Sequence, residues 1–408
     1  MAEGGKKAKG KGKAPKPGAK QDSPLVKLLK ACLKEYDAKC IQFECSPCAT
    51  IRDALRLGID EEKPIYSFVM DPKDRRKVEY WNDKKFTKYF EEGGEEGLAA
   101  RKKKKKKKVS KPEKPLVRLL PFIDTLRNHR YCQIKELLVW DVYVDHSDMM
   151  CLASMLTKGC YDMEMIELVD CFINQKALDV FAPSVNHTRT LSDLILDFNE
   201  FGDSGCQVLC EGLANCHWLI RLSLCFCDLH KQSGIWLGNL IAETSIRELF
   251  LDGNHLEAEG AIALLTQISE AAVNEGFERE RAAQLKIEQA EAAKNGKTEL
   301  PMEISHLHLA ENGINHMGRG GNFAPVRCMQ LIKEIIKNSK DLQEIDLFGN
   351  EIGQVGGRIL LEGVLARIDN KLPKIGVRVS HLLNQDTYDA ICKLAPGPKP
   401  KKKKNIRR

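Results

Sequence analysis

The stretch Leu191-Ser-Asp-Leu-Ile-Leu-Asp-Phe-Asn-Glu-Phe201 carries leucines at 191, 194 and 196, an asparagine at 199 and an apolar residue at 201. The same spacing returns in four other segments, which begin at Leu219, Ile246, Ile304 and Leu342. Two weaker copies begin at Ile134 and Met163. A short unit of this kind cannot bury its apolar face alone, so the copies are expected to stack into a solenoid.

The spacing of the copies predicts what each one contains. The first five begin at 134, 163, 191, 219 and 246, and the last two at 304 and 342. A period near 28 leaves room for a short strand and a full helix. We expect the leucines of the Leu-x-Leu core to point inward. The asparagine suits a turn, because its side chain bonds neighbouring backbone groups. Cys171 and Cys227 fill the same position with a small buried group.

The repeat resembles the ribonuclease-inhibitor-like subfamily of leucine-rich repeat proteins over residues 116–390. The resemblance implies an α/β solenoid, a horseshoe or arc with parallel strands on the concave face and helices on the convex face. The two longer steps predict insertions. Residues 270–300 are rich in Ala, Glu, Lys and Arg and are expected to form an extended charged helix or a helical hairpin. Residues 318–326 are expected to form a flexible loop.

Composition divides the chain into five predicted regions. They are a disordered basic tail (1–22), a small helical capping module (23–100), a Lys-rich linker (101–115), the repeat domain (116–395) and a basic C-terminal tail (396–408). Within the module, apolar spacing predicts helices from Pro24 and from Ala49. A closing strand is expected near Ile375 and a closing helix over 386–394.

The net charge of +7 conceals a strong polarity. Residues 1–115 carry 31 Lys/Arg and 18 Asp/Glu, and residues 396–408 carry seven Lys/Arg and no acid. The stretch between them has 26 basic and 39 acidic residues. Basic runs bind polyanions, which include nucleic acid, lipid headgroups and the acidic tails of tubulin. The predicted polyanion-binding residues are Lys102, Lys104, Lys106, Lys401 and Lys403. The alternative is that these runs only solubilise the chain or fold back on the acidic repeats.

Cysteine usage and hydropathy indicate a compartment. The sequence has no apolar run long enough to cross a bilayer and no secretory leader at its start. Many of the 15 cysteines fall at repeat positions that should be buried, so we expect reduced thiols in a cytoplasmic protein.

Two groups of residues are candidate metal sites. Cys32, Cys40, Cys45 and Cys48 include a single Cys-x-x-Cys, which fits a zinc site or a redox pair, although Cys32 also fits the core face of the first helix. His306, His308 and His316 cluster in one repeat, where ordinary surface histidines explain them as well. We predict no metal and no cofactor.

The residues that point out of the strands carry the candidate binding site. Alternation along each strand predicts an aromatic stripe and an acidic ladder on the concave face. The residues of the stripe and the ladder, which together form the candidate binding site, are Trp140, Asp141, Asp170, Asp197, Phe198, Phe226, Phe250, Asp252, Asp346 and Phe348. Exposed aromatic residues are typical of protein-interaction hot spots, and carboxylates favour a basic partner. The alternative is that some of the aromatic rings are packing between neighbouring strands.

The sequence contains none of the phosphate-loop, Gly-x-Ser-x-Gly or His-Glu-x-x-His motifs, so we predict a non-enzymatic interaction scaffold. Its layout is similar to that of leucine-rich repeat proteins of ciliary axonemes. This resemblance implies a cytoplasmic structural adaptor of the axoneme or the microtubule cytoskeleton, with other axonemal or cytoskeletal proteins as partners and no membrane. One alternative is a small-GTPase regulator of the Ran GTPase-activating type, acting through turn residues such as Asn199, Asn254, Asn312 and Asn350. Another is a nuclear RNA-associated factor.

Overall fold

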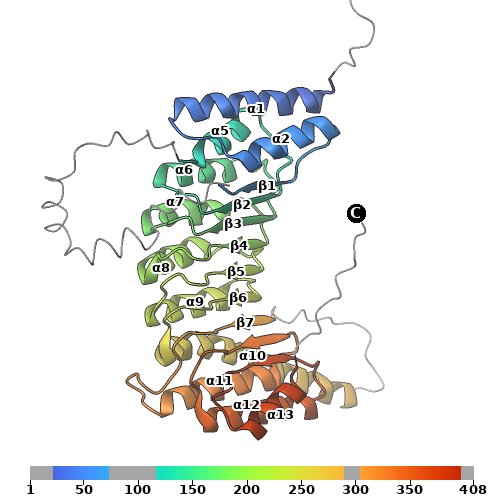
Figure 1. The fold of residues 1–408 in the computed structure, drawn as a ribbon. Coiled ribbons are helices and arrows are strands. Elements are labelled where there is room, and N and C mark those ends of the chain that lie inside the picture. Colours follow the sequence, from blue (N-terminus) through green and yellow to red (C-terminus); the bar gives the residue numbers. More distant parts are fainter. Residues whose placement is uncertain (1–21, 73–115, 289–303, 397–408) are drawn as a thin grey trace, which may run out of the picture.

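The repeats stack into one open sheet. The computed structural model describes residues 22–72, 116–288 and 304–396, and there nine parallel strands pair in chain order (Figure 1). The strands are β1 (Ser67–Met70), β2 (Glu136–Trp140), β3 (Met165–Val169), β4 (Asp193–Ile195), β5 (Arg221–Ser223), β6 (Glu248–Phe250), β7 (His306–His308), β8 (Glu344–Asp346) and β9 (Gly376–Arg378).

Helices alternate with the strands and lie together on one side of the sheet (Figure 1). They are α1 (Pro24–Gln42), α2 (Ala49–Glu61), α5 (Leu120–Asn128), α6 (His146–Leu156), α7 (Gln175–Val185), α8 (Gly202–Leu213), α9 (Lys231–Glu243), α10 (Glu257–Glu288), α11 (Phe323–Asn338), α12 (Gly353–Asp369) and α13 (Gln385–Leu394). This arrangement confirms the predicted α/β leucine-rich repeat solenoid. The opposite side, which we call the open face, is the one that the sequence analysis expected to be concave.

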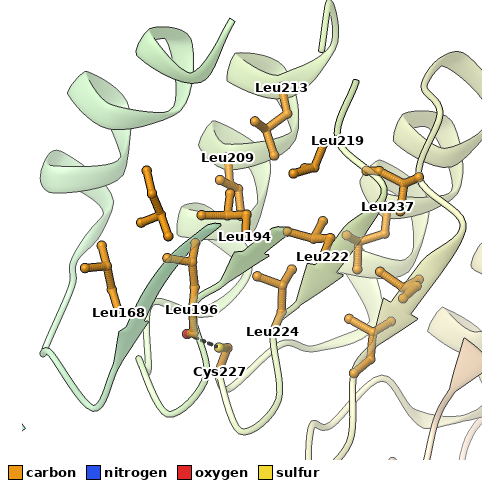
Figure 2. Packing of buried hydrophobic residues seen from close by; sticks show 14 of the residues in the cluster. Leu168, Leu194, Leu196, Leu209, Leu213, Leu219, Leu222, Leu224, Cys227 and Leu237 are labelled. Atoms are coloured by element: carbon orange, nitrogen blue, oxygen red, sulfur yellow. Dashed lines mark hydrogen bonds between the residues drawn. The ribbon is translucent and has the colours of Figure 1, made fainter. Parts of the chain in front are cut away.

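The inward leucines form a continuous core between strands and helices. Leu194, Leu222 and Leu224 are fully buried against helix residues such as Leu209 and Leu237 (Figure 2). Full burial of one leucine side chain stabilises the fold by about 1.5–3 kcal/mol. The strands are only three to five residues long, so this shared core, rather than strand length, holds each repeat in place.

Buried asparagines tie each repeat to the one before it. Asn199 Oδ1 accepts the backbone N–H groups of Cys171 and Ile173 at 3.0 and 3.1 Å. Its Nδ2 donates to the carbonyl of Leu168 at 2.7 Å. Where cysteine replaces asparagine, the thiol takes over part of this role, because Cys227 Sγ donates to the Leu196 carbonyl at 3.3 Å (Figure 2).

The N-terminal helices are α1 and α2, as predicted, but they bring a strand that the sequence analysis did not predict. In β1, Phe68 and Met70 pair with Leu137 and Val139 of β2 and occupy the two leucine positions. The Phe68 ring packs 5.0 Å from that of Phe122. Residues 23–72 therefore supply the first strand of the sheet as well as two helices.

The longer insertion is helical as far as the described residues reach. α10 is continuous for 32 residues, to Glu288, and residues 289–303 lie outside the described part. The loop expected over 318–326 was predicted too long, because α11 begins at Phe323. Pro325 lies in its first turn, where a missing backbone N–H leaves no hydrogen bond unmade.

The closing elements are β9 and α13, as expected. After α13 the chain returns along the last strand, and the backbone N–H of Val377 donates to the Ala395 carbonyl at 3.1 Å. This contact covers part of the edge of β9, which would otherwise present unpaired backbone groups.

The four N-terminal cysteines lie in the hydrophobic core, and Cys48 Sγ contacts Thr50 Oγ1 at 3.1 Å. Within the described ranges no group of three or more His, Cys, Asp or Glu side chains is placed to hold a metal ion. In the same ranges no helix is long and apolar enough to span a membrane.

Candidate interaction surface on the open face

The structure separates the predicted concave-face residues into two groups. Six lie on the strands or directly after them and face the open side, namely Trp140, Asp197, Phe250, Asp252, Asp346 and Phe348. The other four, Asp141, Asp170, Phe198 and Phe226, occupy the turn that follows each strand and have left-handed backbones with φ from 52° to 59°. We call the line of these turns the rim.

The open face and its rim are strongly acidic. Each repeat from β2 to β8 has four outward positions, namely three alternating residues that face the open side and the rim residue that follows them. Together these positions hold eleven carboxylates and a single arginine, Arg221. The carboxylates belong to Glu136, Asp141, Glu167, Asp170, Asp193, Asp197, Glu248, Asp252, Glu311, Glu344 and Asp346. Such a surface attracts basic partners and disfavours acidic ones.

Part of this acidity has a structural role. Asp197 Oδ1 accepts from Ser223 Oγ and from the Cys225 N–H at 2.7 and 2.9 Å. Asp346 is 2% exposed, accepts the Phe348 N–H at 2.9 Å and pairs with Arg378. Burial raises the pKa of both carboxyls. Asp252 acts in the same way, because its Oδ1 accepts the Ala310 N–H at 2.8 Å. These three side chains hold neighbouring repeats together.

Arg221 and the histidines of the β7 repeat lie beside carboxylates. Arg221 is 2.7 Å from Glu248 and 3.4 Å from Asp193. His308 Nδ1 is 3.4 Å from Asp252. His306 lies similarly, 3.7 Å from Glu248, and His316 is 3.9 Å from Glu351. The histidine cluster found in the sequence is therefore dispersed among acidic neighbours.

The strand aromatics do not form a single stripe. Trp140 and Phe348 follow the second leucine of their repeats, whereas Phe250 lies between the two leucines. Each has its own polar neighbour. Trp140 Nε1 donates to Glu167 at 2.7 Å, the Phe250 ring is 4.6 Å from the His308 ring, and the Arg378 guanidinium is 5.8 Å from the Phe348 ring.

The rim aromatics are more exposed. The rings of Phe198 and Phe226 stack at 4.7 Å with 7° between their planes, yet 50% and 41% of these residues remains exposed. Gly253 occupies the next turn, and a Cβ there would lie 2.2 Å from the Phe226 ring. The ring therefore packs on the backbone of the following repeat.

The rim acids influence one another. Burial, a hydrogen bond with Asp141 and the nearby charges of Asp141 and Glu200 raise the pKa of Asp170 to about 6. A bound cation would relieve this repulsion.

Sequence reasoning missed two further rim aromatics, Tyr143 and Phe172, which are 51% and 36% exposed. Their rings lie 6.3 Å apart. Both fall two residues after the rim carboxylates Asp141 and Asp170, so extending the repeat alignment by two positions would have found them. The predicted polyanion-binding lysines (Lys102, Lys104, Lys106, Lys401 and Lys403) lie outside the described residues.

The turn asparagines are unsuited to act on a GTPase. Asn199, Asn254 and Asn312 are fully buried, and Asn350 is 1% exposed. Their side-chain amides donate to backbone carbonyls inside the solenoid. None is placed to orient a water molecule in a bound partner.

Comparisons with known proteins agree with this architecture. The Leucine Rich repeat family matches residues 187–210 and 243–265. The chain is 25% identical over 227 residues to the ribonuclease inhibitor of Sus scrofa and 29% identical over 234 residues to that of Mus musculus. The chain is a leucine-rich repeat protein that is similar to these ribonuclease inhibitors.

The similarity to the ribonuclease inhibitors covers only part of each protein. The matches cover 50% and 57% of this chain and 49% and 41% of the two inhibitors, so the chain spans half or less of these relatives. It is also 26% identical over 227 residues to NACHT, LRR and PYD domains-containing protein 12 of Mus musculus, of which it covers 21%. Membership in the leucine-rich repeat family supports a protein-interaction scaffold.

Proposed function

We propose that this protein is a non-enzymatic scaffold that binds basic proteins on its open face and serves as a structural adaptor of the cytoplasmic microtubule cytoskeleton, in particular the ciliary axoneme. The observation that carries the first half is the excess of carboxylates on the open face from β2 to β8. The second half rests on the Lys-rich runs at 102–108 and 401–404, whose charge is opposite to that of tubulin's acidic tails. One acidic face and two basic segments let the protein join a basic subunit to an acidic lattice.

Cosedimentation with polymerised microtubules across a salt series tests the adaptor role. We expect wild-type protein to pellet at low salt and to be released as salt rises, because salt screens exposed charges. Changing Lys102, Lys104, Lys106, Lys401 and Lys403 to Gln should weaken pelleting at least about tenfold, since each lysine near an anionic surface contributes about 1 kcal/mol.

A variant with the same loss of charge provides the control. Five exposed lysines of the solenoid, Lys158, Lys176, Lys340, Lys371 and Lys374, are changed to Gln instead. This variant should pellet like wild type. If both variants lose binding equally, only net charge matters. Tighter binding to RNA than to microtubules would favour the RNA-associated alternative, and failure to pellet would remove the adaptor role.

A second candidate function is inhibition of a basic ribonuclease. The acidic open face and the similarity to proteins named ribonuclease inhibitor favour it. Pancreatic ribonuclease assayed with increasing amounts of the protein tests this directly. Stoichiometric inhibition that is lost in Trp140→Ala and Phe250→Ala would support it, and unchanged ribonuclease activity at micromolar protein would exclude it.

A further inference from the structure

A regular array of side chains lines the rim of four consecutive repeats. After each of β2, β3, β4 and β5, the first and third turn residues supply one aromatic ring and one carboxylate. The pairs are Asp141 with Tyr143, Asp170 with Phe172, Phe198 with Glu200, and Phe226 with Asp228. The carboxylate precedes the aromatic residue in the first two pairs, and the aromatic residue precedes the carboxylate in the last two. We call these eight residues the rim array.

The array ends abruptly. The corresponding pairs in the next three repeats are Gly253 with His255, Glu311 with Gly313, and Gly349 with Glu351. None contains an aromatic ring of the Phe or Tyr type. The buried leucines and asparagines continue through all of these repeats, so stacking of the solenoid does not require the rim aromatics.

Backbone hydrogen bonds hold the array in register. The N–H of Asp170 donates to the Asp197 carbonyl at 3.1 Å, and the N–H of Phe198 donates to the Cys225 carbonyl at 2.8 Å. The N–H of Phe226 continues the series to Asp252 at 2.9 Å. Neighbouring pairs are therefore one strand spacing apart, roughly 4.8 Å, and the array extends about 14 Å. An extended peptide covers this length with four or five residues.

Three phenylalanines of the array have an unfavourable backbone conformation. Phe172, Phe198 and Phe226 have φ of 55°, 59° and 55°, in the left-handed region where glycine is the usual residue. Glycine occupies the first turn position at 253 and 349 and the third at 313. A bulky side chain in this conformation costs on the order of 1 kcal/mol, so the exposed rings are retained against a local penalty.

We infer that the rim array binds an extended, arginine-bearing segment of a partner protein. A guanidinium stacks flat on an aromatic face and donates its N–H groups to a carboxylate beside it, which lysine cannot do in the same geometry. The array presents one ring and one carboxylate from the same turn in each of four repeats. Because Phe226 stacks on Phe198 and packs on the backbone at Gly253, guanidinium stacking falls mainly to Tyr143, Phe172 and Phe198. Asp228 lies 3.8 and 3.9 Å from the imidazoles of His230 and His255, so a guanidinium would share this carboxylate with the two rings. The inference deepens the proposed scaffold role and does not depend on microtubule binding.

Fluorescence anisotropy with the full chain tests the inference. The probe is a fluorescein-labelled seven-residue peptide in which arginine alternates with leucine. Two control peptides replace arginine by lysine, which keeps the charge, or by citrulline, which keeps the shape. We expect binding to weaken about tenfold with lysine, equivalent to 1.4 kcal/mol, and to disappear with citrulline.

Matched protein variants locate the site. Phe198→Ala should weaken arginine-peptide binding about tenfold, whereas Phe198→Tyr should retain it, because a tyrosine face also binds cations. Phe323→Ala is the control, since Phe323 is 83% exposed at the start of α11, far from the array in the repeat order. Circular dichroism checks that each variant is folded.

Equal binding of the arginine and lysine peptides would overturn the inference, and so would an equal loss of peptide binding in Phe198→Ala and Phe323→Ala. Peptide binding that appears only after Lys102 to Lys108 are changed to Gln would also overturn it, because the chain's own lysines would then occupy the array.

Microtubule cosedimentation of Phe198→Ala separates the two proposals. Normal pelleting with lost peptide binding leaves the adaptor role intact, and peptide binding without pelleting leaves only the rim inference.

Discussion

The repeats of β2–β5 and those of β6–β8 share one interior but differ on the rim. In both regions the leucines are buried and a buried asparagine or cysteine joins neighbouring repeats, apart from the first repeat, where Val142 stands. The first region has aromatic rings and carboxylates on its rim. In the second region glycine, histidine and glutamate replace them, and long connections interrupt the period. The comparison teaches that burial constrains the repeat, whereas the exposed turn residues are free to specialise.

The largest expected effect is confined to the second region. Arg367 is 2% exposed and donates to the backbone carbonyls of Ile336, Leu342 and Pro373 at 2.8, 3.1 and 2.6 Å. Arg367→Met should destabilise the protein by about 3–5 kcal/mol, because it leaves several buried carbonyls unpaired. Hydrogen exchange should show lost protection in α11 and α12 with β2–β5 unchanged. Uniform loss throughout the solenoid would mean that the two regions unfold as one unit.

The next effect should be equal in the two regions. Asn199→Ala and Asn254→Ala each remove an amide that accepts two backbone N–H groups of the preceding repeat. Each should cost about 3 kcal/mol in urea denaturation. Asn199→Cys should cost less, because cysteine occupies the same position at 171 and 227. A difference above about 1 kcal/mol between the two alanine variants would show that the interior is not equivalent.

A smaller effect distinguishes two glycines at the same turn position. Gly253→Ala places a Cβ against the Phe226 ring, whereas Gly349→Ala places one 2.5 Å from the flexible Glu311 side chain. Both residues have positive φ, so each variant should lose about 1 kcal/mol. Gly253→Ala should lose more and should also weaken arginine-peptide binding by displacing Phe226. Equal losses with unchanged peptide binding would contradict the packing of Phe226 on Gly253.

The smallest effect is a pH dependence on the rim. The pKa of Asp170 is raised to about 6, above its ordinary value, so ionisation of this carboxyl opposes folding. Stability should therefore rise as pH falls from 7 through about 6 towards 4. Asp170→Asn should stabilise the protein at pH 7.5 by on the order of 1 kcal/mol after allowance for solvent screening, with no gain at pH 4. Thermal denaturation at both pH values measures it, and an equal gain at both would rule out this carboxyl as the cause.

Sequence periodicity predicted most of the fold because the buried positions repeat. The leucines around 194 and 222, the turn asparagines, α13 and the long α10 all follow from spacing and composition. β1 was not predicted because Phe68 and Met70 occupy its two leucine positions, and because its repeat does not continue at the expected period. The loop before α11 was predicted too long, since α11 begins at Phe323 and Pro325 is acceptable in its first turn.

The candidate surface was predicted less completely. Alternation identified the outward residues, but it does not show that Asp346 is buried against Arg378 or that Phe198 stacks on Phe226. These facts depend on the distance between neighbouring repeats and on the left-handed turns. The second aromatic pair, Tyr143 and Phe172, lay beyond the positions that strand alternation covers.

The asparagine hydrogen bonds also affect the order in which the repeats can fold during synthesis. Each asparagine reaches back to the repeat before it, so a newly synthesised repeat keeps backbone N–H groups, such as those of Cys171 and Ile173, without this partner until the next repeat emerges from the ribosome. Folding during translation should therefore trail synthesis by about one repeat, and the newest repeat should be the one most open to proteases or chaperones.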